Sequence, residues 1–136
     1  MKTIYKISLL LLTLGMISCS AQRQLASRLS GEWIIEEYEV SLANGSETRM
    51  ENAGTIVFLN SGRGQQTFTS AITQIDASNT GDFRWENNAN VVFIWGRDAQ
   101  YRKAWIIVES SRSKQLWRST DTEGNVQTMI LSKKKE

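Results

Sequence analysis

The chain has 136 residues, with 16 basic and 14 acidic side chains, one cysteine and no histidine or proline. Without histidine, Ser-His and Cys-His nucleophile systems are excluded and the commonest metal ligand is missing. A single cysteine cannot close an internal disulfide, and the chain lacks the concentrated basic stripe typical of nucleic-acid binding. We therefore expect no enzyme, no cofactor, no metal site and no nucleic-acid partner.

The N-terminal residues have the order of a bacterial secretory signal. Lys2 and Lys6 precede an apolar run from Ile7 to Ile17, and small residues follow at Ser18-Cys19-Ser20-Ala21. The run is shorter than the about 20 residues that a membrane-spanning helix needs. Met16-Ile17-Ser18-Cys19 resembles the lipobox of bacterial lipoproteins. The resemblance implies that residues 1–18 are a signal peptide and that Cys19 is lipidated as the first mature residue.

This interpretation predicts a membrane-anchored protein of the cell envelope. The resemblance to bacterial lipoproteins also implies sorting to the outer membrane, because Ser20 rather than an aspartate follows the cysteine. The alternative is cleavage after Ala21, which would give a secreted or periplasmic protein. Removing Lys2 and Lys6 with the signal leaves 14 basic and 14 acidic residues, so the mature chain has no net charge.

Residues 19–30 are predicted to form a tether with a short helical turn. Leu25 and Leu29 are four residues apart, so one turn of helix would place both on a single face.

From residue 31 onward, the pattern changes to short β-type runs separated by turn residues. We predict strands at Glu32–Ser41, Thr55–Asn60, Gly64–Ile75, Asp82–Glu86, Val91–Trp95, Lys103–Ser110, Gln115–Thr120 and Val126–Ser132. The intervening segments are rich in Asn, Gly, Asp and Ser, which tolerate the backbone angles of tight hairpins.

Eight short strands with short connections favour antiparallel pairing of sequence neighbours. The predicted fold is all-β: a single up-and-down, eight-stranded antiparallel barrel over residues 31–133, followed by a basic tail at 134–136. A two-sheet β-sandwich is the alternative. We expect a monomer, and a barrel of this size is either filled by side chains or holds one small ligand.

The segment Leu29-Ser30-Gly31-Glu32-Trp33 resembles the opening of a lipocalin-type barrel, and the later pattern resembles small bacterial lipocalin-like domains. The later segments are Gly54-Thr55-Ile56-Val57-Phe58, Gly81-Asp82-Phe83-Arg84-Trp85, Val91-Val92-Phe93-Ile94-Trp95 and Met129-Ile130-Leu131-Ser132-Lys133. The resemblance implies that Trp33 closes the narrow end of the barrel and that Gly31 lets the chain approach it closely.

Aromatic residues recur along the predicted strands and are candidates to line the interior. They are Tyr38, Phe58, Phe68, Phe83, Trp85, Phe93, Trp95, Trp105 and Trp117. A three-residue turn within Asn87–Asn90 would set Trp85 opposite Phe93, whereas a two-residue turn would place them on opposite faces. These residues either surround a small ligand or fill an ordinary core.

Charged residues give weaker signals. Glu36, Glu37 and Glu39 are expected on a solvent-facing strand edge, and Asp121 and Glu123 are expected to form a turn. Arg84, Arg97, Arg102 and Arg118 would meet an anionic ligand only if they pointed inward, and exposure is the better expectation.

Two functions stay open at this point. The first is a membrane-anchored barrel that binds a small hydrophobic or amphiphilic molecule in its interior. The second is a surface-binding accessory or inhibitor lipoprotein with a filled barrel and no interior ligand. A large aromatic cavity would support the first, and a filled interior would support the second.

Overall fold

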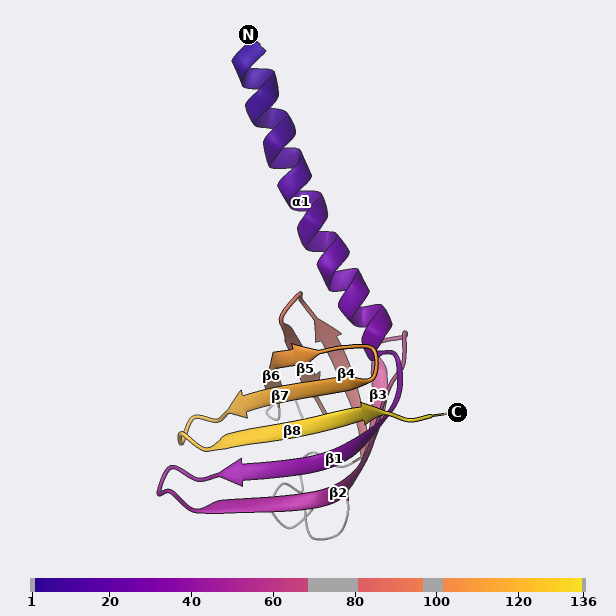
Figure 1. The fold of residues 1–136 in the computed structure, drawn as a ribbon, viewed down its shortest axis with the longest axis vertical. Coiled ribbons are helices and arrows are strands. Elements are labelled where there is room, and N and C mark those ends of the chain that lie inside the picture. Colours follow the sequence, from indigo (N-terminus) through magenta and orange to yellow (C-terminus); the bar gives the residue numbers. More distant parts are fainter. Residues whose placement is uncertain (1, 69–80, 97–101, 136) are drawn as a thin grey trace.

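A computed structural model describes residues 2–68, 81–96 and 102–135 (Figure 1). The elements in chain order are α1 (Lys2–Leu29), β1 (Gly31–Ser41), β2 (Glu47–Phe58), β3 (Arg63–Phe68), β4 (Gly81–Asn87), β5 (Val91–Trp95), β6 (Arg102–Ser110), β7 (Lys114–Thr120) and β8 (Val126–Lys133).

The strands form a closed barrel in which every strand pairs antiparallel with its neighbours in sequence. The barrel closes between β1 and β8, where Trp33 is opposite Lys133 and Ser41 is opposite Val126. Closure pairs the edge strands that an open sheet would expose. The predicted up-and-down, eight-stranded barrel is confirmed, and the sandwich alternative is not observed.

The strand predictions agree with the structure to within one or two residues except at β2 and β3. Strand β2 begins at Glu47, eight residues before the predicted Thr55. Strand β3 covers Arg63–Phe68, and residues 69–75 of the predicted strand lie outside the described residues.

The first half of β2 was missed because it forms a hairpin arm with exposed faces. Within the described residues, 47–53 pair with β1, and the pairing with β3 starts at Gly54. Arg49 in this arm forms ion pairs of 3.2 Å with Glu37 and 3.1 Å with Glu39. A polar segment of this kind lacks the apolar alternation by which strands are recognised in a sequence.

The core lies inside the barrel and follows the period-two alternation of the strands. Along β8, for example, Gln127, Met129 and Leu131 are buried and the residues between them are less so. The buried apolar residues form one cluster: Leu25, Leu29, Trp33, Ile35, Tyr38, Val40, Ala53, Ile56, Phe58, Phe83, Trp85, Val92, Ile94, Trp105, Trp117, Met129 and Leu131.

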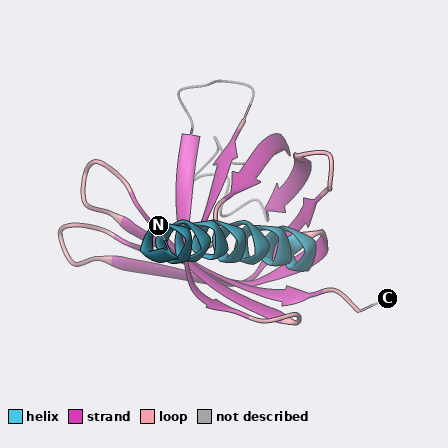
Figure 2. Ribbon diagram, turned by 90° about the horizontal axis from the view of Figure 1, so that it is seen from above, coloured by secondary structure: helices cyan, strands magenta, loops and turns pink. Residues whose placement is uncertain are grey.

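Helix α1 ends against one mouth of the barrel (Figure 2). Leu25 and Leu29 from its last turns are buried in the core cluster, which agrees with the predicted helical turn. In the described part of the chain, no helix combines the length and the apolar character that a membrane span requires.

Hydrogen bonds fix the end of α1 to the neighbouring strand connections. Gln22 Nε2 donates to the carbonyl oxygen of Asn87 at 2.7 Å, and Asn87 Nδ2 donates to the Gln22 carbonyl oxygen at 3.1 Å. Arg28 donates to Ser110 Oγ at 3.1 Å. The mouth formed by the turns at 59–62, 88–91 and 111–114 and by the end of β8 is called the helix end below. Residues 22–29 are therefore docked on the barrel at the helix end.

Candidate functional site

Six of the predicted lining residues lie inside the barrel: Tyr38, Phe58, Phe83, Trp85, Trp105 and Trp117. None of them is more than 7% exposed. They come from β1, β2, β4, β6 and β7, so the barrel brings together side chains that are up to 79 positions apart in the chain.

These aromatic rings contact one another. Phe58 packs edge-on against Phe83, Trp85 and Trp117, with ring centroids 5.6, 5.2 and 5.7 Å apart. Trp105 continues the cluster, with its centroid 6.4 Å from those of Tyr38 and Trp117. Edge-to-face contacts at these separations are favourable packing arrangements. The described rings therefore pack against one another in the barrel interior.

Two of the indole N–H groups in this cluster, those of Trp85 and Trp117, have partners. Trp85 Nε1 donates to the carbonyl oxygen of Leu59 at 3.0 Å, and Trp117 Nε1 donates to Gln115 Oε1 at 3.2 Å. A buried indole without a partner would lose hydration energy, so these bonds stabilise the filled arrangement.

Phe93 and Trp95 do not line the interior. They alternate along β5 with the buried Val92 and Ile94, and each is only half-buried. The cause is the turn: Asn88 and Val91 close a two-residue loop, so Trp85 is opposite Ile94 instead of Phe93. Their placement in the predicted lining is thus wrong, because the shorter turn shifts β5 by one residue. Phe68 belongs to β3, but its side chain lies outside the described residues.

At the helix end, Trp33 is fully buried, as the Gly-x-Trp segment predicted. Its Nε1 donates to the carbonyl oxygen of Leu29 at 2.8 Å, and Lys133 Nζ lies 4.6 Å from the centre of its ring system. Lys133 Nζ also donates to the Ser30 carbonyl oxygen at 2.5 Å. Burial lowers the pKa of Lys133 from its ordinary value of 10.5.

Gly31 makes this close packing possible. Its φ is +121°, a conformation that side-chain-bearing residues rarely adopt. A Cβ atom at this position would lie 2.7 Å from Lys133 Nζ. The glycine therefore leaves room for the lysine to reach the Trp33 ring.

Polar side chains point into the barrel toward the mouth opposite the helix end. Gln127 is opposite Val40 on β1 and Ser119 on β7, and both Gln127 and Ser119 are buried. Among the described residues, the Gln127 side-chain oxygen has no hydrogen-bond donor. A buried oxygen of this kind is an acceptor that a bound molecule could satisfy.

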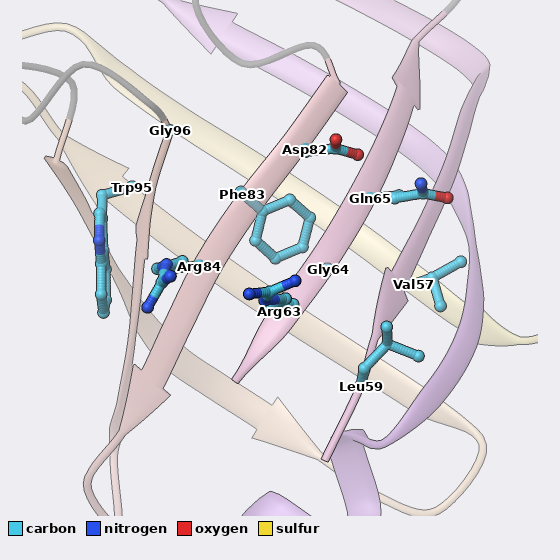
Figure 3. Close-up of a pocket in the computed structure, with 10 residues that line it drawn as sticks. All are labelled: Val57, Leu59, Arg63, Gly64, Gln65, Asp82, Phe83, Arg84, Trp95 and Gly96. Carbon is cyan, nitrogen blue, oxygen red and sulfur yellow. The ribbon is translucent and has the colours of Figure 1, made fainter. Parts of the chain in front are cut away.

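A groove of about 850 Å³ lies over β2, β3, β4 and β5 (Figure 3). Most of its lining consists of outward-facing residues, whereas Gly64 and Phe83 form its floor. Because Gly64 has no side chain, the Phe83 ring can lie against its backbone from the inside. The lining residues are Val57, Leu59, Arg63, Gly64, Gln65, Asp82, Phe83, Arg84, Trp95 and Gly96.

The sequence did not predict this groove. Arg84 was expected to be exposed and was a ligand candidate only if it pointed inward, and Arg63 had not been singled out. Both are exposed and alternate with the buried Phe83 and Gly64. The pairing register between β3 and β4 places Arg63 opposite Arg84, and that register cannot be derived from the sequence of either strand alone.

The remaining arginine candidates do not form an interior site in the part of the chain that is described. Arg118 is exposed on β7. Arg102 begins β6, but its side chain lies outside the described residues, as does the whole of Arg97.

The carboxylates that were expected to form a turn, Asp121 and Glu123, lie on the surface. Asp121 accepts hydrogen bonds from the backbone N–H groups of Glu123 and Asn125 at 2.9 and 3.0 Å, as expected for a turn. The hydrogen bond from the Asn125 side chain holds the pKa of Asp121 below its ordinary value of 3.8. Across the described residues, no group of three His, Cys, Asp or Glu side chains is arranged to bind a metal ion.

Cys19 is exposed on α1, ten residues before the helix ends. At about 1.5 Å of helix rise per residue, it lies roughly 9 Å along the axis from the buried Leu25. A group attached to Cys19 would therefore stay close to the helix end of the barrel.

No protein-family model matches the chain, and no curated protein matches it. One solved structure with a similar arrangement is a redesigned β-barrel, with a TM-score of 0.47 and 13% sequence identity. The similarity covers 81% of this chain and 95% of the designed one.

Proposed function

We propose that this chain is a lipid-anchored protein of the bacterial cell envelope, in which a filled, lipocalin-like barrel serves as a binding accessory through its outer surface. The observation that carries the proposal is the aromatic cluster. The rings that were candidates to surround a ligand contact one another at 5.2–6.4 Å. The described groove, in contrast, lies on the outside.

The distribution of charge supports anchoring at the helix end. Basic residues outnumber acidic ones there: Arg23, Arg28, Arg63, Arg112, Lys114, Lys133, Lys134 and Lys135 against Glu32, Glu86 and Glu109. Toward the opposite mouth, among the described residues, Glu37, Glu39, Glu47, Glu51, Asp82, Asp121 and Glu123 outnumber Arg49, Lys103 and Arg118. A basic surface next to Cys19 is suited to an anionic membrane surface.

A comparison of two tryptophan variants tests the filled interior. Trp105 is buried inside the barrel, whereas Trp95 is on the outer face of the adjacent strand. Trp105→Ala should lower the free energy of unfolding by about 3–5 kcal/mol, because it leaves a cavity in a packed core. Trp95→Ala should cost clearly less. Equal and small costs in urea unfolding would indicate a hollow interior.

Binding inside the barrel is the second candidate, and the unsatisfied Gln127 oxygen favours it. A screen of fatty acids, sterols, haem-like pigments and short sugars distinguishes the two by tryptophan fluorescence and melting temperature. A filled barrel should show no response to the uncharged probes. If one binds, Gln127→Leu should weaken binding provided that the ligand donates to this oxygen. With no ligand there, Gln127→Leu should be neutral or stabilising, because it removes an unpaired polar group.

A further inference from the structure

Two arginines on the outer face of the barrel are directly opposite each other. Arg63 on β3 pairs with Arg84 on β4, and Arg84 pairs in turn with Trp95 on β5. Figure 3 shows these three side chains along one side of the groove. The Cβ atoms of directly opposed residues are about 5 Å apart, and like charges in such positions repel.

Among the described residues, neither guanidinium has a partner that would offset this repulsion. No ion pair or hydrogen bond of this part of the chain involves the side chain of Arg63 or Arg84. The nearby carboxylate of Asp82 is opposite Gln65. Asp82 lies two positions before Arg84 on β4, which corresponds to roughly 7 Å at 3.4 Å per residue. The groove thus has a basic part with unused donors and a separate part lined by a carboxylate and an amide.

Apolar surface flanks the arginine pair on both sides. Trp95 lies beside Arg84, and Val57 of β2 and Leu59, directly after β2, line the opposite wall. The Phe83 ring contributes to the floor. The volume of about 850 Å³ is within the range typical of small-molecule sites, which is roughly 300–1,000 Å³.

The basic part of the groove is also close to the helix end. Arg63 follows the turn at 59–62, and Asn60 in this turn accepts a hydrogen bond from Ser30, directly after α1. In a chain anchored through Cys19, Arg63 would therefore be near the bilayer surface.

We propose that this groove binds an anionic amphiphile, whose phosphate or carboxylate group is held between Arg63 and Arg84 and whose apolar part contacts Trp95 and Leu59. Guanidinium groups match these anions with paired hydrogen bonds. Hydroxyl or amino groups of the ligand could donate to Asp82 and Gln65. The inference rests on the proposed use of the outer surface, but it does not depend on whether the interior is filled.

Calorimetric titration of the full chain with dihexanoyl phosphatidic acid, below its micelle concentration, tests the site. Removing both arginines in R63Q/R84Q should reduce affinity at least about tenfold, since each charge-assisted hydrogen bond contributes on that scale. The control R118Q removes an exposed arginine outside the groove and should bind as the unmodified chain does. Added salt should weaken binding. Inorganic phosphate should bind more weakly than the amphiphile, and uncharged dihexanoylglycerol should not bind.

Vesicles of phosphatidylcholine with and without phosphatidylglycerol identify the source of the anion. Binding of the monomeric amphiphile that requires both arginines supports a free or extracted molecule. Binding only to anionic vesicles, again lost in R63Q/R84Q, supports a lipid headgroup at the membrane. If no anionic probe binds, or if R63Q/R84Q and R118Q bind equally well, the proposal is overturned.

Two further measurements test whether a loss of binding in R63Q/R84Q comes from misfolding instead of the loss of the site. Melting curves should show that R63Q/R84Q is folded and at least as stable as the unmodified chain, because the repulsion is removed. If it is not, R63K/R84K keeps both charges without the planar fork and should still lose affinity. A molecule bound in the interior would be insensitive to both arginine variants, so failure of the filled-barrel proposal is distinguishable from failure of this one.

Discussion

Trp33 connects the N-terminal helix, the first strand and the last strand through a single side chain. Its indole donates to Leu29 at the end of α1, and its ring system carries the Lys133 ammonium group from β8. The contact between cation and ring adds to the apolar burial and fixes the end of β8 over the helix end. A Cβ atom at Gly31 would lie 2.7 Å from Lys133 Nζ, so a side chain there would displace the end of the lysine from the Trp33 ring.

Replacing Trp33 by alanine should therefore lower the free energy of unfolding by about 3–5 kcal/mol, the usual range for a fully buried aromatic residue. Trp33→Phe keeps most of the apolar area but loses the indole N–H, so its cost should be smaller. Urea unfolding measured by circular dichroism gives both values. A shift of only a few tenths of a kcal/mol for Trp33→Ala would show that this residue is peripheral.

The candidate site shows at the residue scale what the sequence could reveal. Six aromatics were expected inside and are there, because period-two alternation is a property of each strand alone. Phe93 and Trp95 were misplaced because their face depends on the length of one turn. A three-residue turn would have set Phe93 opposite Trp85, but the turn has two residues. Arg63 and Arg84 become neighbours only through the β3–β4 register, which no local pattern reveals.

Among the elements, the last turns of α1 act as a lid on one mouth of the barrel. Leu25 and Leu29 insert into the core cluster, and Gln22 and Arg28 bond to strand connections. The sequence predicted the apolar face but not the docking, since the spacing of two leucines does not identify the surface that they cover. The first half of β2 was missed for the opposite reason: its side chains are mostly exposed, so it carries no buried alternating face.

Truncating the lid residue Leu29 should destabilise the whole barrel. Leu29→Ala is expected to cost about 2–5 kcal/mol, because the side chain is fully buried against the core. Ser27→Ala is the matched control, as this residue is exposed two positions away on the same helix. Thermal and urea unfolding of the two variants give the comparison. Similar curves for both would mean that α1 rests on the barrel without stabilising it.

Taken as a whole, the molecule has two dissimilar ends. The helix end is closed by Trp33, Leu25 and Leu29 and has an excess of basic residues, whereas the opposite mouth is more acidic and has Gln127 and Ser119 inside. The eight-stranded order could be predicted because the connections are short and rich in turn residues. The difference in charge between the two ends could not be predicted, because it arises only when barrel closure brings the strand ends together.

Anchoring through Cys19 would give these ends a fixed orientation, with the helix end toward the bilayer and the acidic mouth away from it. Cys19→Ser should then release the protein from the membrane fraction of the producing bacterium, because acyl chains supply the attachment. Ser20→Ala leaves the cysteine intact and should remain with the membranes. Mass spectrometry of the mature N-terminus decides the chemistry. A chain that begins at Gln22 without an attached lipid would contradict anchoring, and the basic residues around α1 would then need another partner.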